Sequence, residues 1–163
     1  HAERKGRADL AAVCIATKGG FRRINAQSNG WRPGDMSPFG IETCIRESHR
    51  ALNAVFKIGP IPLWMLHHPP TNDRQGKRLV AAMLAARKLV REGLVREIGI
   101  CNATVTQLEM VDEVVGPLAC VQSSFSLWDK AAALPLRAKE GLTSRRGLLD
   151  WCRQHGAVFI PYG

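Results

Sequence analysis

The sequence predicts an α/β fold with a parallel sheet, arranged as an incomplete (β/α)8 barrel. Short apolar runs alternate with amphipathic helical segments about four times, and one apolar run is left over. Repeated strand–helix units of this kind form parallel sheets with right-handed crossovers. The uneven length of the units favours a barrel over a doubly wound sheet. No Gly-x-Gly-x-x-Gly motif follows the first strand, which argues against a Rossmann nucleotide site.

The length and composition indicate one globular unit, and we expect residues 1–163 to form a single partial barrel domain. Hydrophobic residues make up 45% of the chain, which supports a sizeable core and excludes a disordered protein. No run reaches the roughly 18 apolar residues of a membrane span, and the polar N-terminus has no signal-peptide core. We therefore expect no membrane partner.

The charge and the cysteines restrict the partners and the compartment. The net charge of +9 makes the surface attractive to anions. The basic residues are scattered, without a stripe of interleaved aromatics, so we expect an anionic small ligand and no nucleic acid. The five cysteines include no Cys-x-x-Cys pair, and most lie in apolar runs. This pattern predicts reduced thiols, a cytoplasmic protein and no metal site.

The first quarter of the chain predicts a strand, a loop and a helix. Residues 13–17 are rich in small and β-branched side chains and predict a strand, with Lys18 at its outlet before two glycines. Residues 21–36 have no period and predict a long loop of the kind that covers active sites. Ser37 and Pro38 supply an N-cap and a first-turn proline, and the helical spacing of apolar residues continues from there.

The next segment predicts a strand, a helix and a second strand. The apolar run 63–67 is fenced by prolines, which predicts a strand buried on both faces with His67 at its outlet. Residues 79–90 show amphipathic spacing and predict a helix that ends at Gly93. Residues 95–100 predict the following strand.

The last third repeats this alternation. Thr104 and Gln107 form a capping-box signature and predict the start of a helix that Pro117 ends. Short strands are predicted over residues 118–121 and 157–160. A polar loop (126–144) and a helix (145–155) are predicted between these two strands.

Polar side chains gather at the predicted strand outlets, where the loops of a parallel barrel converge and ligands bind. The residues at these outlets are Lys18, His67, Cys101, Asn102, Gln122 and Tyr162. A lysine, a histidine, two amides and an aromatic at one rim suit a flat polar ligand whose oxygen is protonated. We expect His49, His68 and His155 to be surface residues and the Met and Trp side chains to lie in the core.

These residues lie in segments that resemble the aldo-keto reductase superfamily. The segments are VCIATKGG, LWMLHHPP, LVREGLVREIGICNATVTQLE, CVQSSFSL and LLDWCRQHGAVFIPYG. They follow the order and spacing of the family and cover nearly the whole chain. The GG…WRP loop followed by IRESHRAL most resembles the bacterial and fungal branch of general aldo/keto reductases, of the pyridoxal-reductase-like type.

The resemblance implies a metal-free (β/α)8 barrel that reduces an aldehyde or ketone with NADPH. The catalytic set of the family is an Asp, a Tyr, a Lys and a His. The Tyr protonates the carbonyl oxygen, and the Lys, itself paired with the Asp, lowers the pKa of the Tyr. Lys18 matches the catalytic Lys, and His67 matches the catalytic His, which lies beside the carbonyl oxygen.

The resemblance also implies a cofactor role for the remaining outlet residues. Asn102 and Gln122 match the amides that hydrogen-bond the nicotinamide carboxamide, and Cys101 stands in place of the usual Ser. Tyr162 matches the aromatic residue on which the nicotinamide ring stacks.

Several positions depart from the family pattern. The Asp and Tyr of the family lie upstream of the segment that contains Lys18, and Tyr162 is the only tyrosine here. Pro62 stands at a usual Asp, and Ser123 replaces a common Asn. We expect roughly strands three to seven of the barrel, as a fragment, a truncated gene product or a degenerate copy. Its open edges would leave it marginally stable, aggregation-prone or completed by self-association.

Two functions from different classes therefore remain open. The first is an NADPH-dependent oxidoreductase acting on a small-molecule carbonyl substrate. The second is a truncated, non-catalytic nucleotide-binding or regulatory relative.

Overall fold

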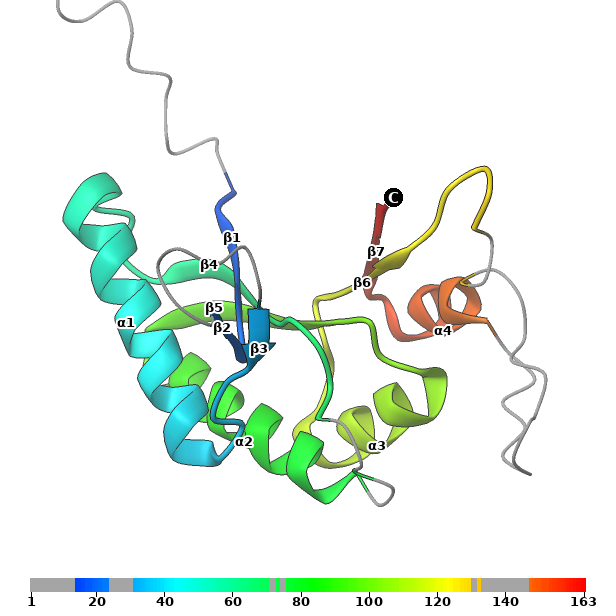
Figure 1. Cartoon of the computed structure of the whole chain (residues 1–163), viewed down its shortest axis with the longest axis horizontal. Helices are drawn as coiled ribbons and strands as arrows, with labels where there is room; N and C mark the ends of the chain where they lie inside the picture. The colour runs from blue at the N-terminus through cyan, green and yellow to red at the C-terminus, as the bar shows by residue number, and fades with distance from the viewer. Residues whose placement is uncertain (1–13, 24–30, 71–72, 74–75, 130–131, 133–146) are drawn as a thin grey trace, which may run out of the picture.

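The computed structural model describes residues 14–23, 31–70, 73, 76–129, 132 and 147–163 (Figure 1). Within these residues strands and helices alternate along the chain. In chain order the elements are β1 (Ala16–Gly19), β2 (Phe21–Arg23), β3 (Trp31–Pro33), α1 (Pro38–Phe56), β4 (Ile61–Leu66), α2 (Lys77–Arg91), β5 (Val95–Cys101), α3 (Val105–Val115), β6 (Cys120–Ser124), α4 (Leu148–His155) and β7 (Val158–Tyr162).

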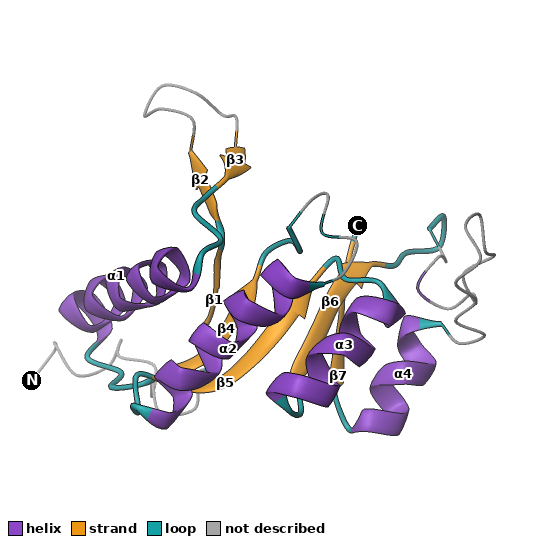
Figure 2. Cartoon of the chain, turned by 90° about the horizontal axis from the view of Figure 1, so that it is seen from below, coloured by secondary structure: helices purple, strands orange, loops and turns teal. Residues whose placement is uncertain are grey.

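Five of the strands form one parallel sheet in the order β1-β4-β5-β6-β7. The spatial order follows the chain order without reversal, whereas a doubly wound sheet reverses its order at a switch point. Figure 2 shows the four labelled helices on one face of this sheet. A sheet that grows in one direction and is covered on one face is an arc of a (β/α)8 barrel. The predicted fold class is confirmed.

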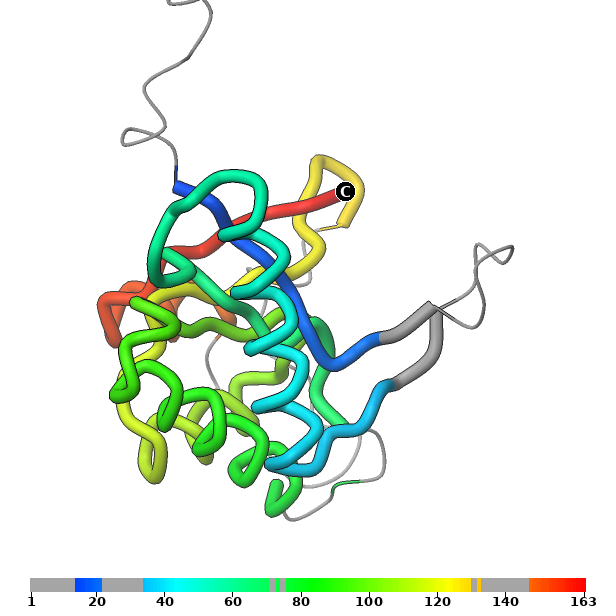
Figure 3. The backbone as a smooth tube through the Cα atoms, turned by 90° about the vertical axis from the view of Figure 1, so that its left-hand side faces the viewer, coloured from blue at the N-terminus to red at the C-terminus, as the bar shows by residue number. Residues whose placement is uncertain are grey.

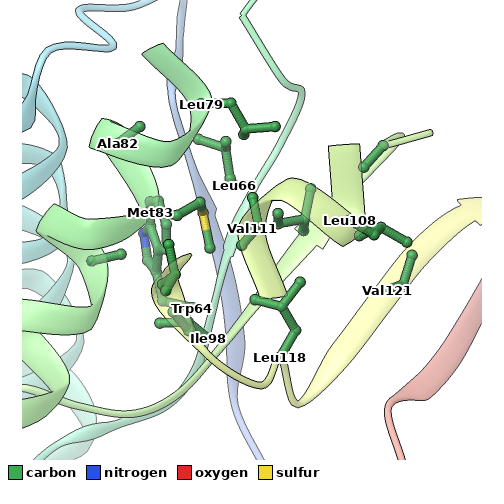
Figure 4. Close-up of a cluster of buried hydrophobic side chains, with 14 of the residues drawn as sticks. Trp64, Leu66, Leu79, Ala82, Met83, Ile98, Leu108, Val111, Leu118 and Val121 are labelled. Atoms are coloured by element: carbon green, nitrogen blue, oxygen red, sulfur yellow. The ribbon is translucent and has the colours of Figure 1, made fainter. Parts of the chain in front are cut away.

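The main core lies between the sheet and the helices (Figure 4). Strand side chains on this face belong to one buried cluster with residues of α2 and α3. α1 packs against β1 and α2 (Figure 3). The fully buried residues of this layer include Trp64, Leu66, Ala82, Met83, Ile98, Leu108, Val111 and Val121. Burying aliphatic and aromatic side chains of this size stabilises a fold by about 1.5–3 kcal/mol each.

The opposite face of the sheet is the inner face of the arc. Met65, Cys101 and Cys120 form a small apolar cluster there, flanked by Leu63 and Ile160. Successive residues of a strand point to opposite faces, so these positions share a side that the helices do not cover. Because Lys18 pairs in register with Met65, the lysine side chain lies on this inner face.

The first strand begins later than its predicted range of 13–17. β1 pairs with β4 from Ala16 opposite Leu63 to Gly19 opposite Leu66, so Lys18 lies inside the strand and not after it. A side chain is excluded at Gly19, because a Cβ atom there would lie 2.5 Å from Cζ2 of Trp64. This close approach packs β1 against the core.

The prediction of a loop over residues 21–36 is wrong in part. β2 and β3 pair as an antiparallel ribbon, with Phe21 opposite Pro33. Strands of three residues are too short to show an alternating pattern, which is why the sequence did not reveal them. Residues 24–30 lie outside the described part of the chain.

The predicted helix starts are confirmed where the capping side chains are described. The Ser37 hydroxyl accepts a hydrogen bond from the Gly40 amide at 3.1 Å at the start of α1. Thr104 and Gln107 form the reciprocal capping box of α3. Both arrangements satisfy backbone N–H groups that a first helical turn leaves unpaired.

The other strand and loop limits differ from the predictions. β6 and β7 each begin later and extend further than predicted, so Gln122 and Tyr162 lie within strands. The described part of the loop 126–144 contains Trp128, which is 95% exposed, so the expectation that all Trp side chains lie in the core is wrong. The helix predicted over 145–155 begins at Leu148 in the described residues, and the polar segment 1–11 lies outside them.

All five cysteines are free thiols. None of the helices in the described ranges is long and apolar enough to cross a membrane.

Candidate active site at the ends of the parallel strands

The site begins where β1 and β4 end side by side. The His67 amide donates a hydrogen bond to the carbonyl oxygen of Gly19 at 2.9 Å, which continues the strand pairing one residue past β4. Alternation along the strand places His67 on the same inner face as Met65. Lys18 lies on that face of β1, so the lysine and the histidine belong to the same rim.

Asn102 occupies the turn that follows β5. Its backbone adopts the left-handed conformation (φ 58°), which asparagine tolerates better than most residues. Its backbone N–H donates a hydrogen bond to the carbonyl oxygen of Gln122 at 2.7 Å, so the turn is fixed to the neighbouring strand β6. Its side-chain nitrogen donates to the carbonyl oxygen of His67 at 3.0 Å.

The side-chain amide of Asn102 has two further partners. Its nitrogen lies 3.3 Å from Nε2 of His68, and its oxygen accepts a hydrogen bond from the hydroxyl of Tyr162. Tyr162 comes from β7 and is 43% exposed. One amide therefore connects the ends of β4, β5 and β7.

Gln122 is held from the opposite side of the turn. The Cys101 thiol lies 3.6 Å from the side-chain oxygen of Gln122 and 3.9 Å from the sulfur of Met65. Burial raises the pKa of the Cys101 thiol to about 11, against a smaller opposing effect of Lys18. The neutral thiol is a weak donor to the amide oxygen. Within the part of the chain that the structure describes, the side-chain nitrogen of Gln122 has no hydrogen-bond partner.

His67 and His68 pack as a pair against Phe21. The two imidazole rings stack at a centroid distance of 5.1 Å and an angle of 23°. The ring of Phe21 lies 5.3 Å from His67 and 5.0 Å from His68. His68 was expected at the surface; its ring is half-buried, stacks on His67 and lies beside the Asn102 side-chain amide.

The surroundings of both histidines favour the neutral imidazole. Burial lowers the pKa of His67, and the charges of Lys18 and His68 lower it further. Burial also lowers the pKa of His68, again with a contribution from Lys18. A neutral imidazole offers one N–H donor and one acceptor nitrogen, so each ring can orient a partner without carrying charge.

The structure thus brings the predicted residues to one rim. Lys18 acts on the histidines and on the Cys101 thiol through its charge, and the others share hydrogen bonds that involve Asn102 or Gln122. Their assignment to catalysis and to the cofactor stays a prediction. His68 is the residue that sequence reasoning missed, and its place directly after a strand-end histidine was the available signal.

Comparison with known proteins assigns the chain to a family. The Aldo/keto reductase family model matches residues 2–163. A comparison of the sequence with curated proteins gave no match.

Solved structures show the same fold. A glycerol dehydrogenase from Gluconobacter oxydans aligns with a TM-score of 0.66 and 21% identity, over 91% of this chain and 39% of that one. An aldo-keto reductase from Bacillus halodurans gives 0.63 and 20%, over 93% and 44%. An aldo/keto reductase from Klebsiella pneumoniae, in complex with NADP and acetate, gives 0.57 and 18%, over 92% and 42%. The chain spans about two-fifths of the length of these structures. By its family match and its fold, this chain belongs to the aldo/keto reductase family.

Proposed function

We propose that the rim formed by Lys18, His67, Asn102 and Gln122 holds the nicotinamide of NADPH and the carbonyl group of an aldehyde or ketone. One observation carries this proposal. The side-chain amide of Asn102, after β5, is hydrogen-bonded to His67 after β4 and to Tyr162 at the end of β7. The membership of the chain in the aldo/keto reductase family and the NADP in the Klebsiella structure support the choice of cofactor.

The residues present fit a nicotinamide carboxamide. That group has a carbonyl oxygen that accepts and an NH2 that donates hydrogen bonds. The side-chain nitrogen of Gln122, which has no partner among the described residues, can donate to the oxygen. The Asn102 side-chain oxygen accepts one bond from Tyr162 and has a second lone pair for the NH2. The partly exposed ring of Tyr162 is available at the end of β7 for stacking.

Lys18 and His67 would act on the substrate oxygen. A bound NADPH supplies the hydride, and negative charge then develops on the carbonyl oxygen. A neutral His67 can donate a ring N–H to that oxygen and orient it. The ammonium of Lys18 on the same face favours the negative charge, and fixed groups of this kind are the largest source of rate enhancement in many enzymes.

The proton donor distinguishes a reductase from a non-catalytic relative. Tyr162 is the only tyrosine of the sequence, and its hydroxyl already donates to Asn102. We therefore expect the 163-residue chain by itself to lack general-acid catalysis, a loss of roughly 10²–10⁴-fold in turnover. Cofactor binding with little turnover would favour the nucleotide-binding alternative for this chain, whereas normal reductase turnover would exclude it.

The test is NADPH binding to the purified chain, followed through the fluorescence of the reduced nicotinamide. Asn102→Gly removes the amide and retains the left-handed backbone, whereas Asn102→Ala also strains the turn. Both variants should bind about tenfold or more weakly if the amide holds the cofactor. Gln154→Ala on α4 is the matched control and should bind as the wild type does. Equal binding by Asn102→Gly and the wild type would contradict the proposal.

A further inference from the structure

The strongest observation beyond the proposed cofactor site is the contact between Asn102 and His68. The Asn102 side-chain nitrogen lies 3.0 Å from the carbonyl oxygen of His67 and 3.3 Å from Nε2 of His68. The side-chain oxygen of Asn102, at the other end of the amide, accepts a hydrogen bond from the hydroxyl of Tyr162.

These contacts determine which nitrogen of His68 carries the proton. A backbone carbonyl only accepts hydrogen bonds, so the amide atom facing His67 must be the NH2 group. The same NH2 faces Nε2 of His68, which must then be the unprotonated acceptor. His68 is therefore neutral, with its proton on Nδ1. The Tyr162 hydroxyl is compatible with this arrangement, because it can donate to the amide oxygen at the opposite end.

We propose that His68 is a positioning residue. In its Nδ1–H form it holds the side-chain amide of Asn102 in the orientation that points the amide oxygen toward the nicotinamide site. This inference rests on the proposed function, because it assigns a purpose to the amide orientation. The stacking of His68 on His67 and its contact with Phe21 hold the imidazole ring in place. His68 itself need not touch cofactor or substrate.

Protonation of His68 on Nε2 would remove the acceptor that holds the Asn102 amide. A proton on Nε2 would point at the NH2 of Asn102, donor against donor. The amide cannot turn over to relieve the clash, because its oxygen would then face the carbonyl oxygen of His67. Among the described residues, the titratable groups whose charges interact with His68 are Lys18 on β1 and His67 after β4. Phe21 and Asn102, which carry no charge, also contact His68.

The first test is the tautomer of His68, measured by ¹⁵N NMR of the labelled chain without cofactor. Near pH 7.5 we expect a protonated Nδ1 and an unprotonated Nε2. The side-chain NH2 signals of Asn102 should shift with the same pH midpoint as the His68 ring. A protonated Nε2 near pH 7.5, or Asn102 signals that do not follow His68, would overturn the proposal.

The second test separates positioning from packing through NADPH binding between about pH 5 and pH 8. His68→Gln can place its oxygen where Nε2 lies, as an acceptor that does not titrate, and should bind within about twofold of the wild type. Its binding should also lose the weakening at low pH that we expect of the wild type. His68→Phe keeps an aromatic ring but removes the acceptor, and should bind about two- to tenfold more weakly at every pH.

His49→Gln on α1 is the control and should leave both the affinity and its pH profile unchanged. Equal losses in His68→Gln and His68→Phe would overturn the positioning role and leave only packing. No NADPH binding by the wild type would overturn the proposed function, whereas the tautomer measurement tests the role of His68 whatever the chain binds.

Discussion

The side-chain nitrogen of Asn102 donates a hydrogen bond to the carbonyl oxygen of His67, across 3.0 Å between the ends of β5 and β4. This bond fixes the side-chain amide next to His67, for which we propose a catalytic role. Two backbone features hold the turn that carries this side chain: the left-handed conformation of Asn102, and the hydrogen bond from its backbone N–H to the carbonyl oxygen of Gln122. The site is thus organised by backbone geometry as much as by its side chains.

The first prediction concerns stability at mildly acid pH. The pKa values of His67 and His68 are lowered from 6.5 in the folded chain, so below about pH 6.5 the unfolded chain binds more protons. The free energy of unfolding should therefore be at its full value above about pH 6.5. It should fall as the pH decreases from there through the lowered pKa values of the two histidines. Urea unfolding midpoints near pH 7.5 and pH 5.5 measure the effect. Removal of both imidazoles in His67→Gln/His68→Gln should flatten this dependence, and an unchanged wild-type midpoint would contradict it.

Lys18 should control the titration of both histidines. Its positive charge contributes to the lowered pKa of His67 and of His68, after the larger effect of burial. Lys18→Met should therefore raise both pKa values toward 6.5 without reaching it, because burial remains. NMR titration of the imidazole protons measures the shift, and Lys88→Met on α2 provides a distant control. Identical titration in Lys18→Met and the wild type would show that the lysine does not face the histidines.

The thiols should differ in their reactivity. Burial raises the pKa of Cys101 and Cys152 to about 11 and that of Cys120 to about 12, whereas Cys14 is exposed. Because the thiolate is the reactive form, Cys14 should be alkylated first near pH 7.5, and the three buried thiols should react only on unfolding. Mass spectrometry after timed iodoacetamide treatment identifies the labelled sites. Early labelling of Cys101 in the folded chain would contradict the described packing of the inner face.

Gly19 should not accept a larger residue. A Cβ atom there would lie 2.5 Å from Cζ2 of the buried Trp64 and 2.7 Å from the sulfur of Cys44. Gly19→Ala should reduce the free energy of unfolding by about 1–3 kcal/mol, because overpacking forces β1 away from the core. Denaturant unfolding measures this loss, with Ala16→Ser at the exposed start of the same strand as control. Wild-type stability in Gly19→Ala would mean that β1 packs less closely than described.

The sequence predicts those features that depend on local patterns. Apolar spacing predicts α1, α2 and α3, and the pair Thr104 and Gln107 predicts the capping box because its partners are three residues apart. Strand limits depend on hydrogen bonds between distant segments. The pairing of β1 with β4 extends through Gly19, and this places Lys18 inside a strand. The β2–β3 ribbon was missed because its pairing lies between strands of three residues.

The candidate site shows the same division. The position of a residue at a strand end predicts that Lys18, His67, Asn102 and Gln122 share a rim, because parallel strands end together. The role of His68 depends on its contact with Asn102, thirty-four residues later in the chain. The local pattern shows only that His68 comes directly after a strand-end histidine, whereas the contact itself follows from the register of β4 and β5.

The most direct test of the cofactor site is the backbone amide spectrum of the ¹⁵N-labelled chain with added NADP. Shifts that saturate with NADP and are confined to the strand ends around Lys18, His67, Asn102 and Gln122 are the predicted result. Shifts centred on the groove lined by Lys77, Leu84, Met110 and Val114 between α2 and α3, or no saturable shifts, would contradict the assignment of this rim to the nicotinamide.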